Sequence, residues 1–288
     1  MKRCLKRLFA PIIDWKRQYS QVLIILVVLF LPVAIDLTSK VLDLLNKSAV
    51  NISEVDVQYR ILINLGNWAV GTVLAIVVFS HIRKSNREEI LKQTISEQMV
   101  WHTLMGYRMC RFLNFRTLSL TRVPIPIQFQ LIAKNIFSKY EFMDNITEVQ
   151  DEIEDVKSIH INCNRLSKTV NLVLSDTYPI DFDKQIPEHK RGYSTILIDR
   201  ASKPGIRKCS RTFIDQVVSE VNYLSQQSVT TINLFATINP AHCYHIASEA
   251  FLTGGGNTIE KLVVYQQSRN ISLGRPFDER IYREIYLR

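Results

Sequence analysis

The chain has 288 residues, of which 47% are hydrophobic and 22% are charged, and its formal net charge is +9. About 200 residues remain after two apolar stretches near the N-terminus, which is enough for one domain with its own core. The five cysteines stand apart and form no CxxC pair, which excludes the paired-cysteine spacing of structural zinc sites.

The two apolar stretches, Val22 to Ile35 and Ile61 to Ile82, predict a membrane hairpin. The second contains no Asp, Glu, Lys or Arg, and at about 1.5 Å per residue it can cross a hydrocarbon core of roughly 30 Å. The first is shorter and reaches spanning length only if its helix continues through Asp36. We therefore expect spans at about 21–42 and 61–82, with one span plus one interfacial helix as the alternative.

Charged residues on either side orient this hairpin over residues 21–82. The basic N-terminus, residues 1–20, carries six Lys and Arg, and more basic residues follow the second span. The 36–60 loop carries three, Lys40, Lys47 and Arg60, against four acidic residues. Because Lys and Arg mark the cytoplasmic side, we expect both termini in the cytoplasm and the loop outside. The long basic segment, with no small-residue cleavage site after the first stretch, argues against a signal peptide.

Beyond the hairpin, apolar residues recur at helical spacing, so we expect a stalk helix over 83–123 and a cytoplasmic helical domain over 124–288. The most regular pattern, from Ile146 to Leu174, alternates steps of three and four, which is typical of an amphipathic helix of about eight turns. One strand-like run is Tyr193 to Ile198. Further helices are expected at Phe213 to Leu224, Ala241 to Phe251 and Pro276 to Leu287. The predicted fold class is mainly α, an N-terminal two-helix transmembrane hairpin followed by a mostly helical cytoplasmic domain.

Three residues of the second span, Asn64, Asn67 and Gly71, share one helical face. Polar and small residues in lipid usually face another helix, where they pack closely and form hydrogen bonds. They can equally line a water-filled path. We therefore take these three as candidates for helix association or a pore.

A basic run around Gly205 is the main charged feature of the predicted domain. An acidic run extends from Glu141 to Asp155. Two such oppositely charged surfaces can pair between subunits, and the basic one can hold a phosphate backbone; a plain solvated face is the alternative for each run. The residues expected to face a protein partner or nucleic acid are Arg200, Lys203, Arg207, Lys208 and Arg211.

No catalytic motif is found in the sequence. It has no GxSxG or HExxH pattern, and the Gly254–Gly256 run lacks the Lys-Ser/Thr of a phosphate-binding loop. His242 and His245 have no second matching pair for a metal, so an ordinary helix is expected there. We therefore expect no catalytic residue, metal or cofactor, and no enzyme activity, although a membrane-bound enzyme with an unrecognised site stays as an alternative.

In architecture, the hairpin followed by a soluble domain resembles the two-transmembrane effectors of bacterial anti-phage defence, such as those of retron and cyclic-nucleotide-signalling systems. The resemblance covers the hairpin and the domain order and transfers no functional residues. It implies a multi-pass protein of the inner membrane that forms a homo-oligomer in the lipid bilayer and perturbs it. The trigger it implies is a regulatory protein or nucleic-acid complex on the cytoplasmic domain. A membrane-anchored adaptor or receptor without pore activity is the alternative.

Overall fold

The computed structural model describes residues 16–46, 57–92, 104–142, 149–150, 156–163, 166–200, 209–252, 258–268 and 274–287. The chain divides into two compact units. One consists of Met1–Glu89 with Arg108–Arg116, and the other of Ile90–Tyr107 with Thr117–Arg288.

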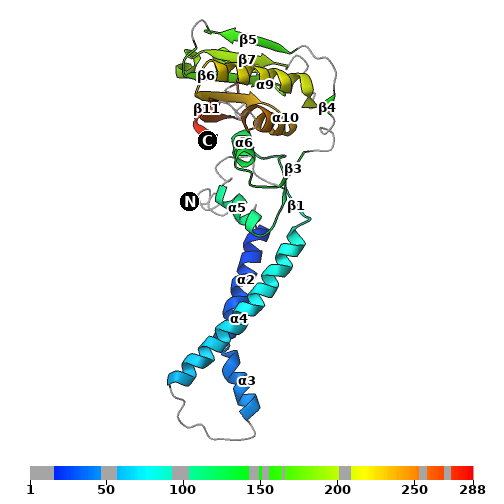
Figure 1. The fold of residues 1–288 in the computed structure, drawn as a ribbon, viewed down its shortest axis with the longest axis vertical. Coiled ribbons are helices and arrows are strands. Elements are labelled where there is room, and N and C mark those ends of the chain that lie inside the picture. Colours follow the sequence, from blue (N-terminus) through cyan, green and yellow to red (C-terminus); the bar gives the residue numbers. More distant parts are fainter. Residues whose placement is uncertain are drawn as a thin grey trace. The chain divides into compact units, whose positions relative to one another are not determined.

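The first unit is a helical hairpin in which α2 (Lys16–Ala34) lies beside α4 (Val57–Asn86), with α3 (Leu37–Asn46) between them in the sequence (Figure 1). Two windows, Arg17–Ala34 and Asn64–Asn86, are long and apolar enough to cross a membrane. Large apolar side chains on both helices are exposed, which suits contact with lipid.

The expected extension of the first span through Asp36 to residue 42 is wrong. Helix α2 ends at Ala34, and Asp36 adopts a left-handed backbone with φ of +49° before α3 begins. The break has a tertiary cause, because the Asn67 amide of α4 holds the backbone N–H of Thr38 and the carboxylate of Asp36. The first window reaches spanning length by starting earlier instead, at Arg17.

The continuous stalk helix expected over 83–123 is also wrong. Helix α4 stops at Asn86, and α5 (Leu104–Phe112) is the helix described between that point and residue 123. The side-chain amide of Asn86 is bound by Gln21 and donates to the Leu113 carbonyl, which fixes the end of α4. Apolar residues assigned to the stalk lie in β1 (Ile90–Leu91) and β2 (Thr117–Ser119), two strands of a small parallel sheet whose third strand is β3 (Lys139–Glu141).

The second unit is built on a six-stranded sheet with the order β11-β10-β9-β6-β7-β5. Its inner four strands are parallel to one another, and both edge strands, β5 and β11, are antiparallel to their neighbours. The bounds are β5 (Lys157–Ile161), β6 (Thr169–Ser175), β7 (Thr195–Asp199), β9 (Thr231–Thr237), β10 (Lys261–Gln267) and β11 (Phe277–Tyr286). The mainly α fold class is therefore overturned, since this domain is α/β.

Two of the expected helices are strands. The described residues of the pattern from Ile146 to Leu174 form β4 (Val149–Gln150), β5 and β6. Strand β6 is buried on both faces, and its mostly apolar sequence therefore fits a helical period as well as a strand. The segment after Pro276 pairs with β10 as β11. The strand near residues 193–198 is confirmed as β7, and the other two expected helices are confirmed as α9 (Arg211–Gln226) and α10 (Pro240–Ile246) with the π-helical turn η3 (Ala247–Leu252).

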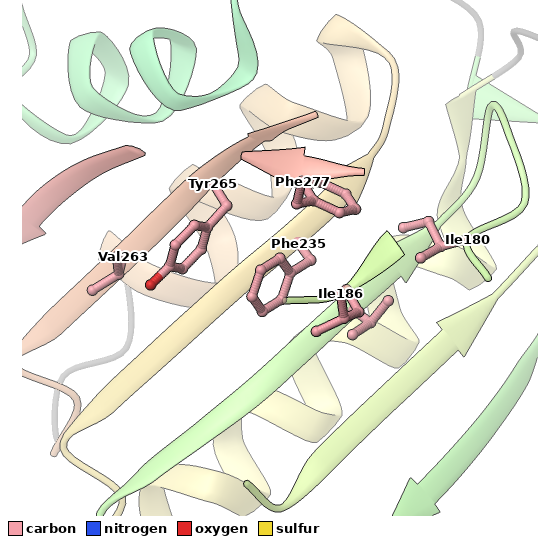
Figure 2. Packing of buried hydrophobic residues seen from close by; sticks show 7 residues of the cluster. Ile180, Ile186, Phe235, Val263, Tyr265 and Phe277 are labelled. Carbon is pink, nitrogen blue, oxygen red and sulfur yellow. The ribbon is translucent and has the colours of Figure 1, made fainter. Parts of the chain in front are cut away.

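The sheet carries apolar layers on both faces. Helices α9 and α10 lie along one face (Figure 1), where alternate strand residues such as Leu172 and Leu174 are buried. Figure 2 shows the cluster on the other face, where the Phe235 and Tyr265 rings stack 4.6 Å apart. Its members are Val173, Ile180, Ile186, Phe235, Val263, Tyr265 and Phe277. The remaining elements are α6 (Ile125–Ala133), α7 (Phe182–Gln185), α8 (Glu188–Arg191), β4 (Val149–Gln150) and β8 (Cys209–Ser210).

Candidate functional site

The strand order creates a topological switch beside β6. From β6 the chain passes through α7 and α8 to β7 on one side, and then through α9 to β9 on the other side of β6. In open parallel α/β sheets, ligands bind outside the carboxyl ends of the strands at such a point, because the connections diverge there and leave a crevice. The carboxyl ends of β6 and β9 are therefore the first place to look for a site.

A pocket of about 490 Å³ lies at these carboxyl ends, a volume suited to a small ligand. We call it the carboxyl-end pocket. It is lined by residues that follow or end β6, β9 and β10, together with two from other segments. They are Thr177, Tyr178, Ala236, Thr237, Ile238, Tyr265, Gln266, Gln267, Ser268, Arg275 and Ile125.

Hydrogen bonds between the β6 and β9 ends fix the wall of this pocket. The hydroxyl of Thr237 donates to the Tyr178 carbonyl at 2.6 Å, and the backbone N–H of Thr177 donates to the Thr237 carbonyl at 2.7 Å. These bonds hold the ends of two neighbouring strands in register. The wall is thus largely formed before a ligand arrives.

Two polar side chains of the pocket have unused binding capacity. The Arg275 guanidinium lies 5.1 Å from the centre of the Tyr178 ring, and no carboxylate of the described residues pairs with it. Arg275 also has a φ of +56°, a conformation that is uncommon for non-glycine residues and is found at functional sites. The Gln266 side-chain oxygen has no hydrogen-bond partner in the described part of the chain.

A buried network of polar groups is centred on Asp176, whose backbone N–H donates to the pocket residue Thr237. Asp176, which follows β6, accepts from Arg200 at 2.6 Å and from Nδ1 of His242 at 2.7 Å. The Nε2 atom of His242 then accepts from the backbone N–H of Ser210 at 2.7 Å, which assigns the ring hydrogen to Nδ1. The carboxylate of Asp176 thus connects the end of β6 with the end of β7 and with helix α10. His242 in turn connects α10 with the start of α9.

Sequence reasoning missed this network. The histidine was interpreted as an ordinary helix residue, and its carboxylate partner lies 66 positions away. The available signal was local, since Asp176 directly follows an apolar run and Asn239 precedes Pro240 at the start of α10. A polar residue immediately after a buried parallel strand is the usual position of a site residue.

The basic run does not form one surface from its described members. Arg200 is buried and paired with Asp176, which corrects its assignment to a partner surface, and Arg211 pairs with Asp215 and Glu249. Burial raises the pKa of Glu249, but hydrogen bonds from Arg211 and His245 outweigh it and hold that pKa below its usual value. The other three members, Lys203, Arg207 and Lys208, lie outside the described residues.

The histidine segment of α10 does not converge on a metal position. His242 belongs to the buried network, His245 contacts Glu249 at 2.9 Å, and burial raises the pKa of the Cys243 thiol well above its usual value. Over the ranges that the structure describes, no three His, Cys, Asp or Glu side chains gather as metal ligands. The Gly254–Gly256 run lies outside those ranges.

The three hairpin candidates are not brought together. Asn67 is buried and bonded to Asp36 and Thr38 of the same chain. A Cβ added at Gly71 would lie under 3.0 Å from the Leu29 carbonyl oxygen, so α2 and α4 make their close approach there. Asn64 is exposed. Two of the three therefore pack the hairpin internally.

Comparison with known proteins gives structural neighbours of low identity. No curated protein matches the chain. Among solved structures, two of the Acinetobacter baumannii Cap4 SAVED/CARF-domain containing receptor match this chain. The structure with the cyclic trinucleotide 3'3'3'-cAAA matches at 10% identity and TM-score 0.42, and the structure with 2'3'3'-cAAA matches at 10% identity and TM-score 0.43. Each match covers 80% of this chain and 60% of the receptor. A further structure of that receptor matches at 8% identity and TM-score 0.39, over 80% of this chain and 58% of the receptor.

A protein-family model agrees with the hairpin and with the domain that follows it. The SMODS- and Ubiquitin system-associated 2TM effector domain matches residues 3–282, nearly the whole chain. Together with the two apolar windows, this match indicates membrane association and confirms the expected resemblance to two-transmembrane effectors of anti-phage systems. The chain belongs to the SMODS- and Ubiquitin system-associated 2TM effector family.

Proposed function

We propose that this protein is a ligand-gated membrane effector of anti-phage defence. A signal molecule occupies the carboxyl-end pocket, the hairpins of several copies then assemble in the inner membrane, and the membrane loses its barrier function. No catalytic step is needed. The observation that carries the proposal is a preformed pocket at the switch point of the parallel sheet, in a chain of a 2TM effector family.

The chemistry of the pocket favours an anionic nucleotide signal. Arg275 supplies a guanidinium that no described carboxylate neutralises, and such a group binds phosphate in a bidentate manner. The exposed ring of Tyr178 beside it offers a surface on which a base can stack. The unpartnered oxygen of Gln266 suits the exocyclic amino group of a base. A cyclic oligonucleotide combines all three features.

In the proposed topology both termini are in the cytoplasm, because the segments that precede and follow the hairpin, residues 1–20 and 83–92, are rich in Lys and Arg. Reporter fusions at Asn46 or Asn51 should therefore be active outside the membrane, and a fusion after Arg288 should be active inside. An external C-terminus would refute the hairpin orientation.

The proposed function is tested with the full-length protein in dye-loaded vesicles, with 3'3'3'-cAAA as the first probe. We expect the probe to bind and to release dye. Replacing Arg275 with Gln should weaken binding about tenfold or more, because a hydrogen bond to a charged group contributes about 1.5 to 3 kcal/mol. Dye release should fall in proportion.

The matched control is Arg280→Gln, which removes the same charge from an exposed position on β11. It should bind and release dye like the wild type. Binding without dye release under any condition would favour a membrane-anchored adaptor. Equal binding by wild type and Arg275→Gln would remove the carboxyl-end pocket as the signal site.

A further inference from the structure

A second pocket, of about 500 Å³, lies over the first residues of the same parallel strands. Thr169, Thr231 and Lys261, which begin β6, β9 and β10, line it, so we call it the amino-end pocket. It opens on the sheet face that carries the cluster of Figure 2, where Val263 and Tyr265 lie on the same side as Phe235. No part of the proposed signalling mechanism uses it.

The floor of the amino-end pocket is polar, which is unusual for the centre of a parallel sheet. The Asn171 amide is fully engaged, since its nitrogen donates to the Lys190 carbonyl and to Thr195, and its oxygen accepts from Asn233. Asn233 lines the pocket and is only 2% exposed. Its side-chain nitrogen donates to Asn171, and no described residue donates to its side-chain oxygen, which leaves that oxygen available to a donor that enters the pocket.

One wall is aromatic and carries a cation without a counter-charge at contact distance. The ammonium of Lys190 lies 5.3 Å from the centre of the Tyr193 ring and 5.9 Å from that of Tyr265. Over the described ranges, no carboxylate lies within ion-pair distance of Lys190. Burial lowers the pKa of Lys190. The negative charge of Glu279 acts in the opposite direction, and the positive charge of Lys261 lowers this pKa further.

The other ionisable side chains of the pocket already have partners. Lys261 contacts Glu284 at 2.7 Å, and His189 contacts Glu279 at 3.2 Å. Lys190 is therefore the cation that can take a new anion without breaking an ion pair. A phosphate in contact with it would also offset the repulsion between the two lysines.

We propose that the amino-end pocket binds a planar aromatic compound that carries a phosphate group, such as a mononucleotide. The phosphate contacts Lys190, the ring packs against the Tyr265 and Tyr282 side of the pocket, and a ring N–H or amino group donates to the Asn233 oxygen. This site is distinct from the signal site at the carboxyl ends, although Tyr265 lines both pockets.

The first test titrates the full-length protein in detergent with adenosine 5'-monophosphate. The affinity for this probe should exceed the affinities for adenosine and for inorganic phosphate, because the pocket contacts both parts. Lys190→Met should weaken binding of the probe at least tenfold. The control Lys184→Met removes an exposed lysine on the neighbouring α7 and should bind like the wild type.

Covalent labelling provides a second readout that does not depend on a folded variant. Pyridoxal 5'-phosphate has a planar ring, a phosphate and an aldehyde. A neutral lysine amine adds to the aldehyde carbon, water leaves, and borohydride then reduces the resulting C=N bond to a stable amine. Mass spectrometry of the wild type should find Lys190 labelled ahead of Lys184, whose pKa is raised by its hydrogen bond to Asp181. Adenosine 5'-monophosphate should protect Lys190.

The two proposals fail separately. Arg275→Gln should leave both the binding of adenosine 5'-monophosphate and the labelling of Lys190 unchanged, whatever it does to 3'3'3'-cAAA. Absence of binding at millimolar concentration, equal binding by Lys190→Met, or labelling of Lys184 in preference to Lys190 would each overturn the amino-end site.

Discussion

Replacing Gly71 with alanine should push α2 away from α4 and abolish the membrane activity that we propose for the hairpin. The new Cβ would lie under 3.0 Å from the Leu29 carbonyl oxygen, a backbone atom that cannot turn aside. Overpacking of a well-packed contact costs about 1 to 3 kcal/mol even where side chains can move. The helices must therefore separate, and interhelical distances of 8 to 10 Å allow an increase of about 2 Å.

Spin labels at Leu23 and Val77, which are both exposed, measure this separation in reconstituted full-length protein. The distance should lengthen in Gly71→Ala, and dye release should be lost with it. The matched control is Gly66→Ala, whose new methyl group meets the Thr38 side chain at 3.1 Å rather than backbone. That variant should change the distance little. An unchanged distance in Gly71→Ala would contradict the close approach.

Replacing Asp176 with alanine should be the most destabilising single change in the α/β domain. It would leave the Arg200 guanidinium buried without its carboxylate and would remove the acceptor that orients His242. Breaking a buried ion pair by removing one partner costs about 3 to 5 kcal/mol. Hydrogen exchange of the full-length protein should show lost protection in β6, β9 and the start of α9.

Asp181→Ala is the control, because its ion pair with Lys184 is exposed and screened by solvent, so that losing it should change protection little. The double variant Asp176→Leu with Arg200→Met should recover part of the lost protection, since it leaves neither of these two charges unpaired. Equal protection in wild type and Asp176→Ala would mean that the network does not support the sheet.

The sequence patterns predicted the elements whose structure is decided by neighbouring residues in the chain. Apolar length predicted the hairpin helices, and amphipathic spacing predicted α9. The errors occurred where partners distant in the chain decide the structure. Helix α2 ends because Asn67 captures the next segment, and the segment after Pro276 is extended because it pairs with β10.

The candidate site was less predictable than the fold for the same reason. A pocket at the carboxyl ends of β6, β9 and β10 exists only after the strand order is known. The expected basic surface used charge in the sequence alone, so it could not anticipate that Arg200 turns inward to a carboxylate 24 positions away. The hairpin face containing Asn67 and Gly71 was found because helical spacing places both on one side.

Two buried asparagines of α4, Asn67 and Asn86, fix the length over which the two arms of the hairpin are held together, because each forms side-chain hydrogen bonds. At about 1.5 Å per residue, they stand about 28 Å apart along α4, close to the hydrocarbon thickness of roughly 30 Å. Both amides are held by partners on the other arm, Asp36 at one end and Gln21 at the other, so neither end can slide along the bilayer normal without breaking them. In the proposed membrane setting the hairpin thus has a fixed hydrophobic length, which the bilayer has to match. Lipids with longer or shorter chains have to deform around it, which makes the acyl composition of the host membrane a determinant of how readily copies cluster.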